Sequence, residues 1–334
     1  MHVWAFYGTP AQNVKGLDLY QVISIVGNGV DFFFVISGFC MYLMAWKTDF
    51  SFSTYGSFLY KRFLRIAPAF YASLLVYATI IKYQDPSFLF GYNIFFHCLF
   101  LNNVITGNVI SAPFWSIGTE WHFYMVLPAV IFLAKKFPLV KSVVILSVCC
   151  IIFSLLVYSG LLSFDWWEKQ ILVRFPEFAA GIIAGYYFKK KSQLPRLLSG
   201  LGGIALFLLL IFGGRLMKFT PIVDKSGDLG FILLTIALPF MTVAFAFLMF
   251  HTITQPSLLS KFLSGKIITY LGRISYSIYL WHSLAIICLT NYLSKMNGRL
   301  YNVSIGFFLV SLLTVIMASI SYKVFESFYF KGRK

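Results

Sequence analysis

Two ionisable side chains, His2 and Glu120, fall within apolar stretches of this chain at positions suited to acid–base chemistry. If the helix that holds Glu120 starts near Pro113, the carboxylate lies about 10 Å along it. If the first apolar segment ends near Gly8–Pro10, His2 lies about 10 Å below that end. A histidine and a glutamate at similar depth form a base and an orienting group for moving an acyl group onto a hydroxyl. The alternatives are a structural ion pair for Glu120 and an incidental position for His2.

Arg62 and Arg65 are neighbours on one helical face, because they are three residues apart. Guanidinium groups suit bidentate binding of phosphates, so the pair is a candidate site for the phosphates of a cytoplasmic donor molecule. The alternative is that both arginines only add positive charge to a cytoplasmic loop.

Asp31 and Trp115 are further candidates for a binding pocket. Asp31 enters an aromatic run, Asp31–Phe34, where it either caps its helix or contributes to the site. The small pair Ser37-Gly38 that follows permits close approach of another helix. Trp115 begins the segment that holds Glu120.

Ser275 and Tyr276 complete the set of pocket candidates. With Tyr279 they share one face of an apolar helix. Hydroxyl groups on such a face either form hydrogen bonds between helices or line the pocket of an acceptor. His122 lies two residues after Glu120 and points to another face, so we assign it a secondary role.

The elements that must position these residues are membrane-spanning helices. The chain has 334 residues and is 59% hydrophobic but only 11% charged, whereas about a quarter of the residues of soluble domains are charged. Its mean hydropathy of +0.81 agrees with this. Because runs of about 18 apolar residues predict spanning helices, we expect an all-α, polytopic membrane helix bundle that forms one domain over residues 1–334. The nine full spans expected are Asp31–Trp46, Ile66–Ile81, Ile117–Ala134, Val140–Gly160, Leu172–Phe188, Leu197–Phe212, Gly230–Phe250, Leu271–Tyr292 and Val303–Val324.

The formal net charge of +16 does not indicate a nucleic-acid partner, because an excess of Lys and Arg is typical of the cytoplasmic loops of membrane proteins. The five cysteines lie in apolar segments without the spacing of a disulfide framework or a zinc site. We therefore expect neither disulfides nor a metal. No cleavable signal peptide is evident.

The segment Tyr92–Ile105 decides the topology, since 14 residues are few for a span. With Arg174 left out because it lies at a helix start, 18 basic residues lie on one side and eight on the other if the segment does not cross; if it crosses, the count becomes 10 against 16 with the basic side outside. Only the first arrangement obeys the positive-inside rule. We therefore interpret the segment as re-entrant or interfacial and place the C-terminus in the cytoplasm.

Four of these segments together resemble the membrane-bound acyltransferase family 3, whose bacterial members O-acylate surface polysaccharides, lipopolysaccharide and peptidoglycan. They occur in the family's order and extend over essentially the whole chain. The matching segments are Gly29–Phe39, Arg62–Pro68, Trp115–Tyr124 and Gly272–His282.

The resemblance implies an O-acetyltransferase of the bacterial inner membrane. Its donor would be cytoplasmic acetyl-coenzyme A, and its partners membrane lipids and a cell-surface or lipid-linked glycan whose sugar hydroxyl accepts the acetyl group. By the same resemblance, His2 and Glu120 are catalytic, and Arg62 and Arg65 bind the donor. The family commonly has a second carboxylate after the first, where this chain has Trp121.

The resemblance also implies that the first span is incomplete. The family has ten spans and an arginine about three helical turns before the histidine, whereas only Met1 precedes His2. The segment His2–Gly8 rises only about 10 Å and cannot cross a bilayer. We therefore expect the functional polypeptide to begin upstream of Met1.

Two other classes of protein fit the same composition. A transporter or flippase for a lipid-linked glycan would also be polytopic, and transporters often carry internal repeats with broken helices. A sensor or scaffold with a degenerate site is the third interpretation. Turnover of labelled acetyl-coenzyme A distinguishes an enzyme from both.

Overall fold

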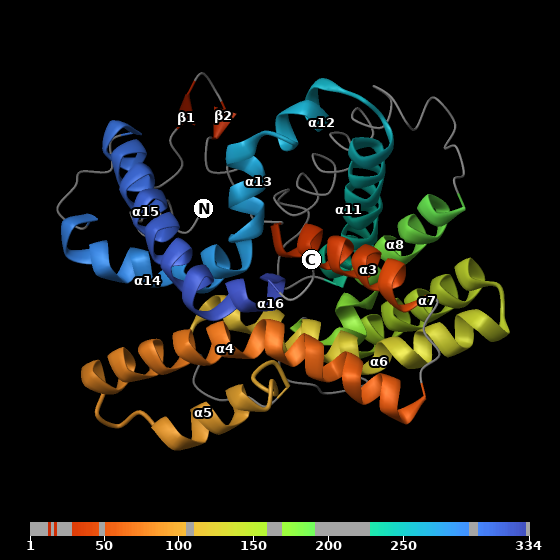
Figure 1. The fold of residues 1–334 in the computed structure, drawn as a ribbon, viewed down its shortest axis with the longest axis horizontal. Coiled ribbons are helices and arrows are strands. Elements are labelled where there is room, and N and C mark those ends of the chain that lie inside the picture. Colours follow the sequence, from red (N-terminus) through yellow and green to blue (C-terminus); the bar gives the residue numbers. More distant parts are fainter. Residues whose placement is uncertain are drawn as a thin grey trace. The chain divides into compact units, whose positions relative to one another are not determined.

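Helices make up nearly all the secondary structure of the computed structural model, which describes residues 13–14, 17–18, 29–46, 51–104, 110–158, 169–190, 228–293 and 300–331. The helices, labelled as in Figure 1, are α3 (Gly29–Ala45), α4 (Phe52–Gln84), α5 (Phe90–Cys98), η2 (Ala112–Phe114), α6 (Trp115–Lys136), α7 (Leu139–Tyr158), α8 (Ile171–Lys189), α11 (Asp228–Thr254), α12 (Leu258–Leu263), α13 (Lys266–Arg273), α14 (Ser275–Leu293), α15 (Leu300–Ser321), η4 (Tyr322–Glu326) and α16 (Ser327–Lys331). The other elements of the described residues are the antiparallel two-residue strands β1 (Asn13–Val14) and β2 (Leu17–Asp18). The expected all-α fold is confirmed.

Five of the described helices are long and apolar enough to cross a membrane: Ser53–Gln84, Trp115–Leu133, Leu139–Val157, Ile171–Lys189 and Ser304–Phe330. Shorter apolar helices, Gly29–Ala45, Met241–Thr254 and Ser275–Thr290, coincide with three more expected spans. The expected span Leu197–Phe212 and the partial span His2–Gly8 lie outside the described residues. The count of nine full spans therefore stays a prediction.

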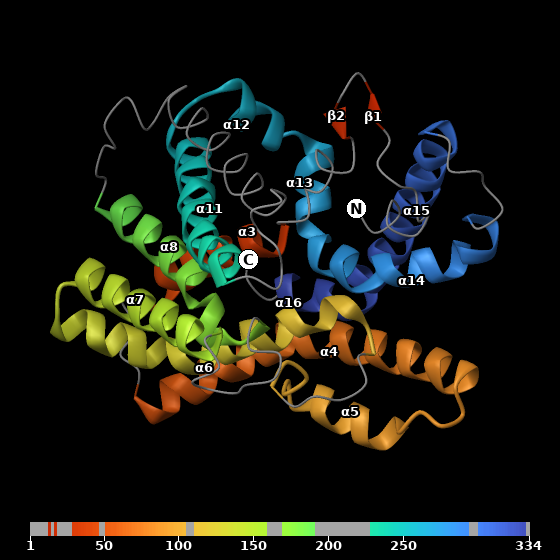
Figure 2. The same cartoon turned by 180° about the vertical axis from the view of Figure 1, so that it is seen from behind.

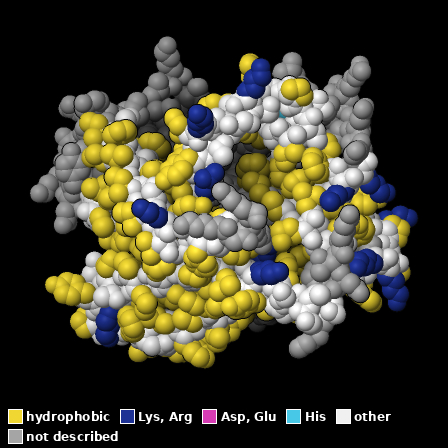
Figure 3. All heavy atoms as spheres, viewed as in Figure 1, with side chains coloured by type: hydrophobic (Ala, Val, Ile, Leu, Met, Phe, Trp, Pro, Cys, Tyr) yellow, Lys and Arg dark blue, Asp and Glu magenta, His cyan; other side chains and the backbone are white. Residues whose placement is uncertain are grey.

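The outward faces of the long helices are apolar, the reverse of a helix in water. On α7 and α15, large apolar side chains recur every four residues and are exposed. They are Val144, Val148, Ile152 and Leu156 on α7, and Phe308, Leu312, Ile316 and Ile320 on α15. Figure 3 shows a similar apolar surface over α4 and α5. Exposed apolar area of this extent marks a protein or membrane contact surface, and together with five helices long and apolar enough to cross a bilayer it indicates an integral membrane protein.

The chain divides into two compact units, which we describe separately. The first contains Met1–Val26, Ser57–Gly118 and Ser264–Lys334, and the second contains Gly27–Gly56 and Thr119–Leu263. The divisions after Gly56 and after Gly118 run through the continuous helices α4 and α6. The expectation of one domain over residues 1–334 stays a prediction.

In the second unit, α3 and α8 pack with their backbones in contact, and α11 lies beside both (Figures 1 and 2). A Cβ atom added at Gly38 would lie 2.1 Å from the carbonyl oxygen of Phe178, and one added at Gly181 would lie 1.9 Å from that of Val35. Neither site accommodates a side chain. The expectation that Ser37-Gly38 permits close helix approach is confirmed, and Gly181 supplies the matching surface on α8.

The helix α4, most of which belongs to the first unit, has 33 residues and extends well beyond the expected span Ile66–Ile81 at both ends. Lys61 and Lys82 lie 21 residues apart on it, a rise of about 31 Å, close to the thickness of the hydrocarbon core. The Lys82 amine donates to the carbonyl oxygens of Pro86 (2.5 Å) and Phe88 (3.0 Å) beyond the helix end. The helix is therefore long enough to span a membrane with basic side chains near both surfaces.

The nine-residue helix α5 covers the first part of the segment Tyr92–Ile105, and turns follow it up to residue 104, where this described range ends. Nine residues rise about 13 Å, so α5 does not cross. After α5, Phe100 adopts a left-handed backbone (φ 58°), and its ring stacks on that of Phe70 at 5.5 Å. A Cβ atom at Gly118 would lie 2.7 Å from Asn103 Oδ1. The turn is thus packed directly against the start of α6. This close contact is possible because residue 118 is a glycine and has no side chain.

Two expected spans are interrupted in the structure. The span Leu271–Tyr292 is divided, because α13 ends at Arg273 and α14 begins at Ser275. Gly272 weakens a helix interior at this point. The span expected to end at Val324 is also interrupted. The α-helix α15 ends at Ser321, and the chain continues as the π-helical turn η4.

Candidate functional site

Glu120 lies in the second turn of α6, whose start is set by Pro113 in the preceding η2 turn. Its side chain is buried and contacts another helix. The hydroxyl of Ser37 on α3 donates a hydrogen bond to Glu120 Oε1 at 3.2 Å, and the hydroxyl of Tyr124, one turn along α6, donates to the same oxygen. The carboxylate is therefore held in a fixed orientation between α3 and α6, as acid–base chemistry requires.

A second buried cluster joins α3 to α8 through three charged groups. Arg174 Nη1 lies 3.1 Å from Asp31 Oδ1 and 2.7 Å from Glu177 Oε1. The Glu177 side chain is 0% exposed and those of Arg174 and Asp31 are 16% and 11% exposed. Asp31 therefore forms an ion pair between α3 and α8. The sequence allowed either a helix cap or a site role for Asp31, and this ion pair is more than a cap of its own helix.

Arg174 and Glu177 are not among the residues that the sequence analysis selected. Both lie inside the expected span Leu172–Phe188, three residues apart. The rule that ionisable residues inside a span mark function would have identified them. The rule does not identify Asp31 as their partner, since Asp31 is 143 residues away.

An aromatic stack connects the two clusters of the second unit. The ring of Phe178, next to Glu177, lies 4.6 Å from that of Phe34 on α3 and 4.0 Å from that of Phe123 on α6, and both pairs are stacked. All three side chains are fully buried. Because stacked rings pack rigidly, the helices that carry Glu120, Asp31 and Glu177 are fixed to one another.

Arg62 and Arg65 lie in the first unit on α4. The Arg62 guanidinium carbon is 5.6 Å from the centre of the Phe58 ring. That of Arg65 is 4.9 Å from the Phe330 ring and 5.9 Å from the Tyr329 ring, both on α16. The structure thus places both arginines against aromatic faces. Binding of a donor there stays a prediction.

Of the α14 candidates, Tyr276 and Tyr279 tie helices together. Tyr276 donates to the carbonyl oxygen of Ile66 at 2.9 Å. Tyr279 donates to that of Pro113 at 2.5 Å and shares a hydrogen bond with Ser116 at 2.6 Å, beside Trp115. These are the inter-helix hydrogen bonds that the sequence allowed.

Ser275 is exposed, whereas Ser277, which the sequence analysis passed over, is buried and hydrogen-bonded. A pocket role for Ser275, Tyr276 or Trp115 stays a prediction. His2 lies outside the described residues, so its pairing with Glu120 also stays a prediction. His122 is buried in α6. No group of three or more potential metal ligands occurs among the residues that the structure describes.

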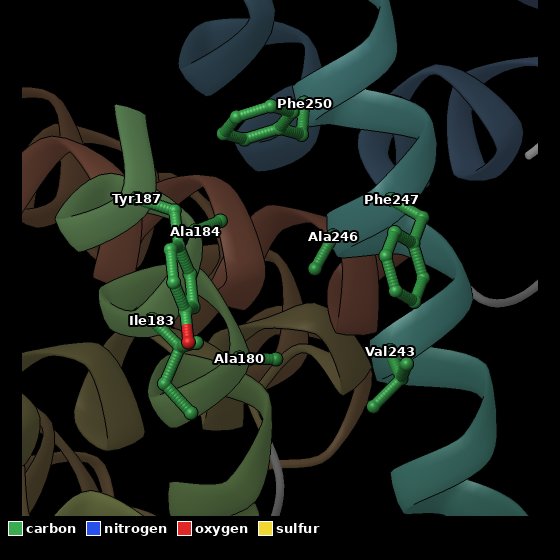
Figure 4. A pocket seen from close by; sticks show the side chains of 8 residues that line it. All are labelled: Ala180, Ile183, Ala184, Tyr187, Val243, Ala246, Phe247 and Phe250. Atoms are coloured by element: carbon green, nitrogen blue, oxygen red, sulfur yellow. The ribbon is translucent and has the colours of Figure 1, made fainter. Parts of the chain in front are cut away.

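An apolar groove of about 180 Å³ lies between α8 and α11 in the second unit. Figure 4 shows side chains from both helices bordering it. They are Ala180, Ile183, Ala184, Tyr187, Val243, Ala246, Phe247 and Phe250. Since these lining residues carry no charge and are mostly apolar, the groove is suited to a hydrocarbon chain.

The family model described as "Acyltransferase domain" matches residues 1–323. Among curated proteins, the peptidoglycan O-acetyltransferase OatA of Listeria monocytogenes is 25% identical over 92% of this chain and 53% of its own length. A candidate acetyltransferase of Acidianus two-tailed virus is 27% identical over 67% of this chain and 63% of its own length. A candidate O-acetyltransferase of Staphylococcus aureus strain COL is 24% identical over 94% of this chain and 57% of its own length. The chain therefore spans little more than half the length of the two bacterial relatives. No solved structure matches it significantly.

Proposed function

The chain belongs to the acyltransferase family whose domain model matches residues 1–323, and on this premise we propose that it is a membrane O-acetyltransferase. The proposed donor is cytoplasmic acetyl-coenzyme A, and the proposed acceptor is a sugar hydroxyl of a cell-surface or lipid-linked glycan. The single observation that carries the proposal is the buried Glu120 carboxylate, oriented by Ser37 and Tyr124 inside a chain of this family. The names of the bacterial relatives, one of them a peptidoglycan O-acetyltransferase, support the reaction and the acceptor class.

The proposed chemistry needs a group that accepts the proton of the acceptor hydroxyl. The hydroxyl oxygen forms a bond to the acetyl carbonyl carbon, the carbon–sulfur bond of the thioester breaks, and coenzyme A leaves as its thiol after taking up a proton. Glu120 and His2 serve as the orienting group and the base. A carboxylate fixed by two hydroxyl donors is well suited to hold a neighbouring imidazole in one tautomer.

The charges of the chain support a site in a bacterial inner membrane with the donor on the cytoplasmic side. The excess of basic residues falls on the side that includes Arg62, Arg65 and the C-terminus, which the positive-inside rule assigns to the cytoplasm. Acetyl-coenzyme A carries phosphates that guanidinium groups bind well. Arg62 and Arg65 are therefore its proposed binding residues.

A transporter or flippase for a lipid-linked glycan is the second candidate function. The family match gives it no support, because membership of an acyltransferase family concerns group transfer. A transporter function would also give Arg62 and Arg65 no donor phosphates to bind.

Replacing Arg65 with Ala should weaken the binding of acetyl-coenzyme A to the purified protein about 10-fold to 100-fold, since a hydrogen bond to a charged group contributes about 1.5–3 kcal/mol. Arg62→Ala should act in the same direction. The measurement is the dissociation constant of radiolabelled acetyl-coenzyme A by scintillation proximity. Lys61→Ala is the matched control, because Lys61 is an exposed cation on the same helix. An unchanged affinity in both arginine variants would contradict donor binding and favour the alternative, that the two arginines only add positive charge to the cytoplasmic side.

A further inference from the structure

The C-terminal end of α15 carries a buried acidic residue to which no role has been assigned above. Residues Tyr322–Glu326 form the π-helical turn η4 before the chain continues as α16. Glu326 ends this turn and is only 2% exposed. Single π-helical turns are rare and often occur at functional sites. An acidic side chain buried at such a turn requires an explanation.

Glu326 is fixed to α14 by a hydrogen bond. The Ser277 hydroxyl donates to Glu326 Oε1 at 2.5 Å and shares a second hydrogen bond with the hydroxyl of Ser321 at 2.9 Å. All three side chains are buried. Within the described part of the chain, Glu326 Oε2 is buried and makes no hydrogen bond. The network therefore holds η4 firmly on α14 but leaves part of the carboxylate charge without direct compensation.

Arg65 is the cation that contacts the helix following this turn. Its guanidinium lies over the rings of Phe330 and Tyr329, which follow Glu326 by four and three residues. Among the described residues the Arg65 guanidinium makes these ring contacts but no hydrogen bond or ion pair. Its N–H groups are thus available to a ligand, while its planar face is occupied by aromatic rings.

Ile66, which follows Arg65 on α4, is held by a hydrogen bond from α14. The carbonyl oxygen of Ile66 accepts the hydrogen bond from Tyr276, the residue before Ser277. Consecutive residues of α14 therefore hold α4, through Tyr276, and η4, through Ser277. Arg65 precedes Ile66 on α4 and contacts the two rings of α16, so it is adjacent to residues of both attachments.

We propose that Glu326 is a positioning residue of an anion site at Arg65, and that η4 and α16 form one wall of this site. The ligand class is the phosphate groups of a nucleotide-containing donor, so this inference rests on the proposed function. Glu326 acts indirectly: its hydrogen bond with Ser277 fixes the turn that places Phe330 and Tyr329 under the guanidinium. With the planar face held, the N–H edge of Arg65 is presented to phosphate oxygens.

The experiment measures the dissociation constant of radiolabelled acetyl-coenzyme A for the full-length protein in detergent. Glu326→Ala should raise it about tenfold. Glu326→Gln should leave it equal to or below that of the unmodified protein, because the Gln amide oxygen still accepts from Ser277. The double variant Arg65→Ala/Glu326→Ala should bind no more weakly than Arg65→Ala alone, since effects that act through one group are not additive.

A second pair of variants keeps the test decisive if Glu326→Ala does not fold. Phe330→Ala removes the wall while leaving the Glu326 network intact, and should raise the dissociation constant. Phe328→Ala is its control, because Phe328 is an exposed ring on the same helix, 48% accessible, that makes no contact with Arg65.

The outcomes separate this inference from the proposed function. If Arg65→Ala weakens binding but Glu326→Ala and Phe330→Ala do not, or if the effects of Arg65→Ala and Glu326→Ala add, the positioning role is wrong and the donor site stands. If Arg65→Ala itself leaves binding unchanged, the donor assignment fails.

Discussion

Replacing Glu120 with Gln is expected to abolish acetyl transfer while leaving the fold intact. Gln has nearly the same volume, and its amide oxygen still accepts hydrogen bonds from Ser37 and Tyr124. The charge and the proton affinity of the carboxylate are lost, and removal of an acid–base group typically costs about 10²-fold to 10⁴-fold in rate. The measurement is the rate of labelled acetyl transfer, with gel filtration and thermal unfolding to verify folding.

Ser147→Ala is the matched control for removing a polar group inside a span. Ser147 lies on α7, and its hydroxyl donates to the carbonyl oxygen of Val143 on its own helix. This variant should keep normal activity. Activity of Glu120→Gln close to that of the unmodified protein would exclude Glu120 from the mechanism and return it to a packing role.

Replacing Arg174 with Met should destabilise the protein severely. The variant leaves Asp31 and Glu177 buried without the cation that lies 3.1 Å and 2.7 Å from them. Removing one partner of a buried ion pair typically costs about 3–5 kcal/mol, because the remaining charge stays in an apolar environment. We expect little folded protein in membranes and a much lower midpoint of thermal unfolding in detergent.

Asp31→Asn is the informative comparison, because it leaves the Arg174–Glu177 pair in place and buries no uncompensated charge. Its loss of stability should be clearly smaller than that of Arg174→Met. Equal losses in the two variants, or a fully stable Arg174→Met protein, would show that the charges are not held together as the structure has them.

The sequence identified the buried acidic residues that lie in recognisable motifs and missed those that do not. Glu120 and Asp31 were selected because each interrupts an apolar, aromatic run. Glu326 was missed because it follows the end of an expected span, where a charge is unremarkable. Its burial depends on the hydrogen bond with Ser277, a contact across 49 residues that no local pattern contains.

Hydropathy predicted where apolar helices occur but not how they begin and end. The shortness of Tyr92–Ile105 predicted that it forms no full span, and α5, which covers its first part, has only nine residues. The division between α13 and α14 and the π-helical turn η4 were missed, because no proline marks either position in the sequence. The role of Gly118 could not be predicted either. A glycine is needed there because the turn that contains Asn103, from an earlier part of the chain, packs directly onto Gly118.

The most direct test of the account is transfer of radiolabelled acetyl groups by the purified, full-length protein in liposomes. Labelled acetyl-coenzyme A is supplied with peptidoglycan fragments or with lipid-linked oligosaccharides as acceptors, and acetylated carbohydrate is separated and counted. We predict that the unmodified protein produces labelled carbohydrate with free coenzyme A, and that Glu120→Gln does not. A folded protein that binds acetyl-coenzyme A but releases no coenzyme A and labels no acceptor would contradict the proposed enzymatic function.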